Sequence, residues 1–292
     1  MGKTQGVLLV LLAAFCFGTM PVLAHGAYAE NVNVPTLLFQ RFGIASILIW
    51  IAILVRREPL PKGKPLGLLV LMGSVVYFGQ AFTLFEALRF LPAGLASILA
   101  FLYPVIVSIA AHFFMDDRLG RQRIFALAVA VLGMGLSIGP IGQGNGVGVF
   151  LALLSAVGAA AYILMGAKAP EDVSPLATNG VVLGSATLSF LVFGLAQGFS
   201  LTDVSEVEWA IGLSMASLIG IASLLKGLKA IGPVNASILL ALEPITATVL
   251  GHTLLNQVLD PLQIAGGILI IGAVIMLVLA KGKTKAEQEV AI

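Results

Sequence analysis

The stretch ASILAFLYP at residues 96–104 returns as ASILLALEP at residues 236–244, 140 residues further along the chain. Six of the nine positions are identical, and a proline ends both copies. The same shift, without a gap, pairs further identical residues along the chain: Gly6 with Gly146, Gly18 with Gly158, Pro35 with Pro175, Leu88 with Leu228, His112 with His252 and Leu119 with Leu259. Matches between prolines and histidines do not follow from a composition rich in Leu and Ala. The chain is therefore predicted to consist of two repeats, residues 1–140 and residues 141–292.

The composition predicts a membrane protein. Of the 292 residues, 59% are hydrophobic and 10% are charged, and the mean hydropathy is +1.06. Soluble domains carry about 25% charged residues. The 16 basic and 14 acidic side chains are nearly balanced, so the charge gives no reason to expect a nucleic-acid partner.

Ten apolar segments are long enough to cross a bilayer as helices of roughly 20 residues. They are residues 6–24, 35–55, 66–85, 93–114, 124–141, 146–167, 176–197, 209–225, 234–255 and 262–280. The short loops between them leave no room for a soluble domain, and no GxxxxGK[ST] phosphate-binding loop occurs. We therefore expect an all-α membrane protein with ten transmembrane helices.

Each repeat holds five of these spans, and five is odd, so the second repeat must enter the membrane from the opposite side. Two inverted repeats are typical of secondary transporters, in which substrate binds near the bilayer midplane and is exposed to either side in turn. A duplicated channel or intramembrane enzyme is the alternative.

The basic residues predict the orientation. With the N-terminus in the cytoplasm, 14 of the 16 Lys and Arg residues fall on the cytoplasmic side, as the positive-inside rule requires. Arg89 falls in an outer loop, and Arg41 lies within the second span, nearer its outer end. Both termini are then cytoplasmic. The alternative interpretation of the first span as a removable signal peptide would break the symmetry.

These residues resemble the drug/metabolite transporter superfamily, specifically its ten-helix EamA-type exporters. The resemblance covers both halves and rests on the two blocks and on the short loops before them, residues 87–92 and 227–233. In the family an acidic residue follows the block, and Asp117 resembles it in the first half. The second half has Asn256 and Gln257 at the corresponding place. Among these exporters the chain looks most like those of amino acids, including aromatic ones, which implies export of such solutes.

Pro104 and Pro244 are symmetry-related prolines within predicted spans. Proline removes a backbone hydrogen bond and frees a carbonyl of the preceding turn. At membrane depth, such backbone is tolerated only against protein or a water-filled cavity. We expect both prolines to act as hinges beside the binding site, the alternative being kinks that serve packing alone.

Glu243, directly before Pro244, is the carboxylate nearest a predicted bilayer centre. A charged side chain there costs about 2.5–3.5 kcal/mol on insertion scales, so such residues usually function. Helical spacing places Asn235 on the same face, and this polar strip suits an ammonium group or a proton. The alternative is a protonated Glu243 that bonds a neighbouring helix.

Aromatic residues give a second predicted set of substrate-binding positions: Phe78 and Phe82 on the third span, Phe101 and Tyr103 on the fourth, and Tyr162 on the sixth. If they converge, they form an apolar pocket suited to amino-acid side chains. Each phenylalanine taken alone is equally explained by core or lipid contacts.

Metal sites, enzymatic activity and phosphate binding have weaker support in the sequence. Three scattered histidines and the single Cys16 lack zinc-ligand spacing, so neither a metal nor a cofactor is expected. Asp116 and Asp117 would suit Mg²⁺ in an intramembrane enzyme. A sugar-phosphate or nucleotide-sugar exchanger of the same fold would need cationic groups in the cavity, and Arg41, Arg89 and Lys226 are predicted toward span ends.

The sequence thus predicts a transporter that exports amino acids or similar small metabolites by alternating access through a central cavity. Its expected surroundings are the lipid bilayer of a bacterial inner membrane, and its expected state is a monomer or weak dimer. We expect a small-molecule substrate and no nucleic acid.

Overall fold

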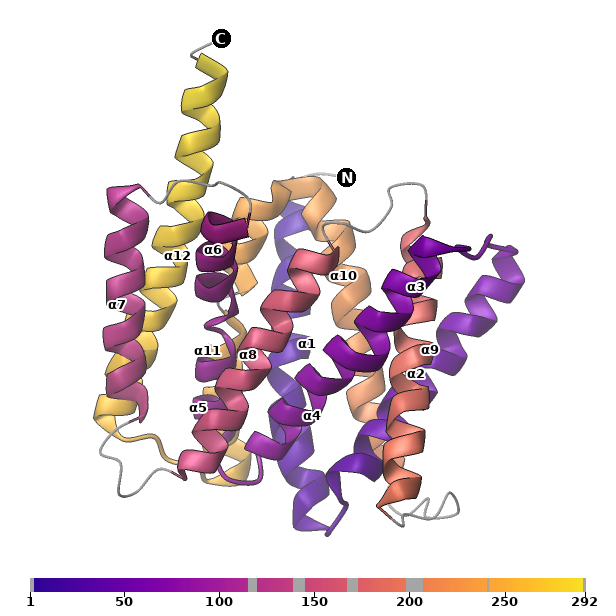
Figure 1. Ribbon diagram of the computed structural model, residues 1–292. Coiled ribbons are helices and arrows are strands. Elements are labelled where there is room, and N and C mark those ends of the chain that lie inside the picture. The colour runs from indigo at the N-terminus through magenta and orange to yellow at the C-terminus, as the bar shows by residue number, and fades with distance from the viewer. Residues whose placement is uncertain are drawn as a thin grey trace.

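The computed structural model describes residues 3–114, 120–138, 145–166, 173–197, 207–240 and 242–290 (Figure 1), and all regular structure within these ranges is helical. The helices are α1 (Lys3–Ala29), α2 (Val34–Arg56), α3 (Lys64–Leu71), the π-helix η1 (Met72–Tyr77), α4 (Phe78–Ala87), α5 (Ala93–Ala100), α6 (Tyr103–Phe114), α7 (Arg121–Ile138), α8 (Gly146–Gly166), α9 (Pro175–Ala196), α10 (Val207–Leu240), α11 (Leu242–Leu255) and α12 (Pro261–Val290).

These elements make the ten expected crossings. The third crossing is α3, η1 and α4 in direct succession, and the fourth is α5 followed by α6. The 34 residues of α10 would extend about 51 Å if straight, which exceeds one crossing. In Figure 1 the ribbon of α10 turns over beside the N-terminus of the chain, and α11 is the next described element.

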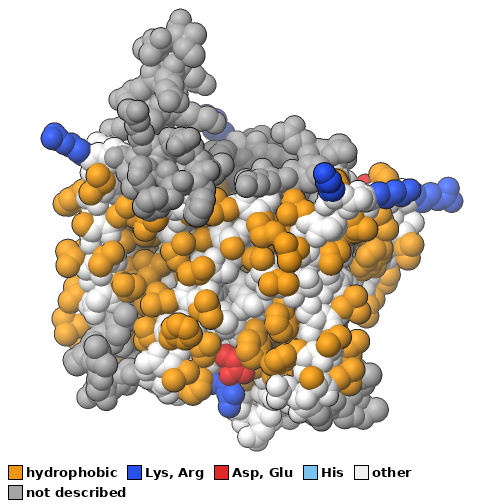
Figure 2. Space-filling view, in the orientation of Figure 1, with side chains coloured by type: hydrophobic (Ala, Val, Ile, Leu, Met, Phe, Trp, Pro, Cys, Tyr) orange, Lys and Arg blue, Asp and Glu red, His pale blue; other side chains and the backbone are white. Residues whose placement is uncertain are grey.

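Six of the described helices are long and apolar enough to span a membrane, and three further apolar helices are shorter. Large apolar side chains stand on the outside of the bundle, including Leu54, Val192 and Ile268, each at least 65% exposed. Figure 2 shows apolar side chains covering the visible flank, with blue basic side chains mainly at its upper rim. Such a surface fits lipid on the flank and water at the ends.

Corresponding helices of the two halves pack against each other. A shift of 140 residues carries α2 onto α9 and α7 onto α12, and both pairs are in contact. Figure 1 shows α7 beside α12 at one end of the bundle and α2 beside α9 at the other. The same shift relates a further pair of contacts. It carries α1 onto α8 and α4 onto part of α10; α1 packs on α10, and α8 packs on α4. The fold is therefore two inverted five-helix repeats.

Residues paired by the shift of 140 also stand in the first turns of paired helices. Pro35 and Pro175 stand in the first turns of α2 and α9, where a missing N–H costs nothing. The Asn33 side chain accepts a hydrogen bond from the Thr36 N–H at 2.9 Å, and Ser174 Oγ accepts one from the Ala177 N–H at 3.1 Å. Both caps satisfy donors that a helix start would otherwise leave unpaired.

The π-helix η1 lies where the third crossing meets α9. A side chain at Gly73 would collide with the Val182 carbonyl and Ser185 Oγ, so only glycine permits this approach. Ser189 Oγ donates to the Ser74 carbonyl at 3.0 Å, which satisfies a group of the widened turn. The turn ends at Tyr77, which faces the centre of the bundle.

Candidate functional site

A cavity of about 380 Å³ lies between the two halves. This volume is within the range of small-molecule sites. The wall is mostly apolar and carries a few polar groups. Its lining residues are Phe17, Met20, Pro21, Arg41, Tyr77, Gln80, Ala81, Leu84, Phe85, Ser97, Ala100, Tyr162, Asn179, Val182, Leu183, Ser217, Ile221, Leu224 and Glu243.

Residues that the repeat pairs with each other line the cavity from both sides. Three lining residues of the third crossing have mates among the lining residues of α10, each 140 positions later: Tyr77 with Ser217, Ala81 with Ile221 and Leu84 with Leu224. The two crossings therefore present equivalent faces to one space. An inverted repeat places its substrate site at such an interface.

Glu243 is brought to this cavity as the second residue of α11. It is partly buried. Its repeat mate Tyr103 lies close enough to interact with it electrostatically. The Glu243 carbonyl and the Thr246 side chain face Gly18, where α1 crosses α11.

Arg41 stands toward one end of its span, as expected, but it also lines the cavity, which was not predicted from the sequence. It is seven residues from the start of α2, or about 10 Å along the helix, yet it is only 6% exposed. Its long side chain reaches the cavity from this depth. The signal was available, because Arg41 is the one Lys or Arg residue that the predicted spans enclose, and a charge inside a span indicates function.

Of the predicted aromatic residues, Tyr162 lines the cavity. Its ring centroid lies 5.2 Å from that of Tyr77, which sequence reasoning missed. Repeat symmetry offered a signal for Tyr77, because its mate is the polar Ser217. The two rings come from opposite halves and form an aromatic wall.

Phe78 and Phe82 lie elsewhere. Phe78 packs on Phe190 and Phe193 at centroid distances of 4.5 and 5.7 Å, and Phe82 packs on Phe193 at 5.0 Å. Phe78 lines a separate apolar groove of about 540 Å³ between the third crossing and α9. These two residues are not among those that line the central cavity, and their substrate contact stays a prediction.

Phe101 and Tyr103 flank the break between α5 and α6. Their rings meet edge to face at 5.8 Å, and Phe101 is buried. Neither is among the lining residues of the central cavity, although Tyr103 lies near Glu243. Asn235 belongs to α10, but its side chain lies outside the described residues, as do Asp116 and Asp117.

A helix break precedes Pro104, the first of the two predicted hinge prolines. α5 ends at Ala100 and α6 starts at Tyr103, so Pro104 stands in the first turn of a new helix. In the second half Pro244 is the third residue of α11, and the residue between α10 and α11 lies outside the described ranges. The two prolines are related by the repeat, and Ala100 and Glu243, which are near them in the sequence, line the cavity. Hinge motion at these prolines stays a prediction.

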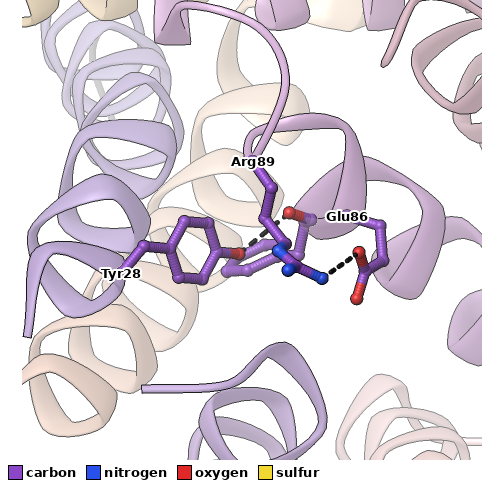
Figure 3. Close-up of polar contacts among 4 residues, drawn as sticks. Tyr28, Glu86 and Arg89 are labelled. Carbon is purple, nitrogen blue, oxygen red and sulfur yellow. Dashed lines mark hydrogen bonds and ion pairs between the residues drawn. The ribbon is translucent and has the colours of Figure 1, made fainter. Parts of the chain in front are cut away.

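A polar pocket of about 430 Å³ lies at the end of the bundle where α4 ends, lined by Asn33, Glu86, Arg89 and Gln197 among others. Arg89 forms an ion pair with Glu86 at 3.1 Å. Figure 3 shows Tyr28 beside this pair, with its hydroxyl donating to the Phe85 carbonyl at 2.9 Å. Arg89 is more than half exposed, so this ion pair contributes little stability.

Within the described ranges no group of three or more His, Cys, Asp or Glu residues could hold a metal ion. His112 and the Asp116–Asp117 pair fall among side chains that are not described, so the expectation of no metal stays a prediction.

A helical membrane protein with a substrate-sized cavity between two inverted halves has the architecture of a secondary transporter. The model of the EamA-like transporter family matches residues 4–139 and again residues 146–279. The chain belongs to this family, and one matched stretch lies in each half of the chain.

Similar proteins carry transporter names. An uncharacterized transporter of Archaeoglobus fulgidus is 25% identical over 91% of this chain and 94% of its own length. The pseudopaline exporter CntI of Pseudomonas aeruginosa is 28% identical over 94% and 95%. A solved crystal structure, 20% identical, covers 94% of this chain and 98% of its own with a TM-score of 0.62, which supports the fold alone.

Proposed function

We propose that this protein exports amino acids, including neutral and aromatic ones, or similar small metabolites from the cytoplasm by alternating access. One observation carries the proposal: the cavity between the two halves joins an apolar, aromatic wall to a carboxylate, Glu243, and a guanidinium, Arg41. A free amino acid presents the complementary groups, namely an ammonium, a carboxylate and a side chain. The name of the relative CntI, an exporter, is consistent with the direction.

The proposed setting is a bacterial inner membrane with both termini in the cytoplasm, where the positive-inside rule puts the basic loops. The proposed state is a monomer or weak dimer. Relatives with transporter names favour transport of intact solute over an enzymatic reaction.

The test is uptake into proteoliposomes of labelled phenylalanine, methionine, threonine and a sugar phosphate, with and without unlabelled solute inside. Saturable amino-acid uptake that internal solute accelerates is expected. Unsaturable flux would instead indicate a channel, and absence of amino-acid uptake would reject the cargo.

A sugar-phosphate exchanger is the second candidate, because Arg41 places a cation in the cavity. Glu243 in the same cavity opposes it, since a dianionic phosphate would approach a carboxylate at close range. Exchange of sugar phosphate without amino-acid uptake would favour this candidate.

A further inference from the structure

Arg41 is a cation held in the membrane interior. Its side chain is 6% exposed, and it contacts the cavity rather than the lipid. Burying a guanidinium is costly unless an anion and hydrogen bonds compensate it. What compensates Arg41 is therefore informative about its role.

The described surroundings of Arg41 supply no anion. Its Nε donates to Ser217 Oγ at 3.2 Å, and one Nη donates to the weakly accepting Met20 sulfur at 3.6 Å. The rings of Phe42 and Phe85 lie 5.0 and 5.1 Å from the guanidinium carbon. Among the described residues no carboxylate lies within ion-pair distance of this side chain.

These contacts orient the guanidinium. Ser217 Oγ donates to the Leu213 carbonyl at 2.8 Å, so its lone pairs remain for Arg41. The neighbouring Ser214 Oγ donates to the Arg41 carbonyl at 2.8 Å and ties α2 to α10. A side chain fixed at backbone and tip loses little entropy when a ligand binds.

A guanidinium has five N–H donors, and the described contacts occupy two of them. The planar fork suits both oxygens of a carboxylate. Ser97 adds a second, independent sign of a ligand: it lines the same cavity, is 6% exposed, and its Oγ has no hydrogen-bond partner among the described residues.

We propose that Arg41 is the carboxylate-recognising residue of the transport site, with Ser97 as an additional donor and Glu243 holding the ammonium group of the same substrate. This assignment rests on the proposed function, because it specifies how the cavity selects its cargo. The cavity then recognises zwitterions with an α-carboxylate and an α-ammonium, and the aromatic wall of Tyr77 and Tyr162 receives the side chain.

The experiment compares phenylalanine with phenylalaninamide, in which a neutral amide replaces the carboxylate, as competitors of uptake into proteoliposomes. The wild type is expected to prefer phenylalanine. Arg41→Gln should raise the KM for phenylalanine about 10- to 100-fold, as expected for lost charge-assisted hydrogen bonds, and should remove the preference over the amide. Arg41→Lys should recover part of the preference for phenylalanine, because lysine keeps the positive charge but lacks the planar pair of N–H donors.

Arg89→Gln is the matched control, because Arg89 is exposed and pairs with Glu86 outside the central cavity. It should leave the preference unchanged. A merely structural Arg41 would lower transport of both compounds equally. An unchanged preference in Arg41→Gln would overturn the assignment. If that variant does not fold, Ser97→Ala, which breaks no described hydrogen bond, should still reduce the preference several-fold, and a wild-type preference there would count against the site.

A binding measurement distinguishes failure of the Arg41 assignment from failure of the proposed amino-acid cargo. The melting temperature of the solubilised protein can be measured with 3-phenylpropanoate, phenylalaninamide or inorganic phosphate, whether or not amino acids are transported. Stabilisation by the carboxylate that Arg41→Gln or Arg41→Lys abolishes or weakens supports the assignment. Stronger stabilisation by phosphate, or no difference between carboxylate and amide, refutes it.

Discussion

Replacing Gly18 with alanine would place a methyl group where α1 crosses α11, beside the backbone of Glu243. That methyl carbon would lie 2.6 Å from Thr246 Cβ and 2.7 Å from the Glu243 carbonyl oxygen. Carbon atoms pack best at about 3.5–4.0 Å, so the two helices would have to separate by about 1 Å. Overpacking of this kind costs about 1–3 kcal/mol.

Gly135→Ala on α7 is the matched control, because its methyl group would meet nothing within 4 Å. Both variants gain the helix preference of alanine over glycine, up to about 1 kcal/mol, so their difference isolates the packing cost. Gly18→Ala should therefore melt roughly 3–9 °C below Gly135→Ala, at about 3 °C per kcal/mol. Thermal unfolding in detergent measures this difference. Equal melting temperatures would refute the close contact of α1 with α11.

The other predictions concern the transport site. Glu243→Gln should abolish or strongly reduce uptake and remove any dependence on an imposed pH gradient; unchanged transport from mildly acidic to mildly basic pH would eliminate a role for its charge or proton. Pro104→Ala and Pro244→Ala should slow exchange while substrate still stabilises the solubilised protein, and wild-type rates in both would discard the hinges. Tyr162→Ala should raise the KM for phenylalanine about tenfold and that for threonine less, because the larger side chain loses more apolar contact; equal effects on both would argue against an aromatic wall.

Much of the fold follows from the sequence because its signals are long-range and simple. The shift of 140 residues identifies the repeats, and the odd number of spans per repeat makes them inverted. Span lengths follow from the bilayer thickness. The helix break before Pro104 fits the expected kink, because proline cannot continue the hydrogen bonding of the preceding turn.

The candidate site was less predictable. Glu243 and Tyr162 were expected to line it, whereas Arg41 and Tyr77 were not. The position of a residue along a helix gives its depth but not the direction in which its side chain reaches. The direction of the Arg41 side chain depends on the approach of α10, and that of Tyr77 depends on the π-turn of η1, to which Tyr77 belongs.

Phe78 and Phe82 show the reverse problem. Their four-residue spacing places them on one helical face, but that face packs against Phe190 and Phe193 of α9. Periodicity identifies a face, and only the packing of helices decides whether protein, lipid or a cavity covers it.

Alternating access is the central claim, and labelling of a single cysteine in the cavity tests it most directly. Cys16 is replaced by alanine, and Ala100, which lines the cavity beside the helix break before Pro104, is replaced by cysteine. A membrane-impermeant thiol reagent is then added on one side of the membrane at a time. We expect labelling from either side, with substrate shifting the ratio of the two rates. Labelling from one side alone, with or without substrate, would contradict the account.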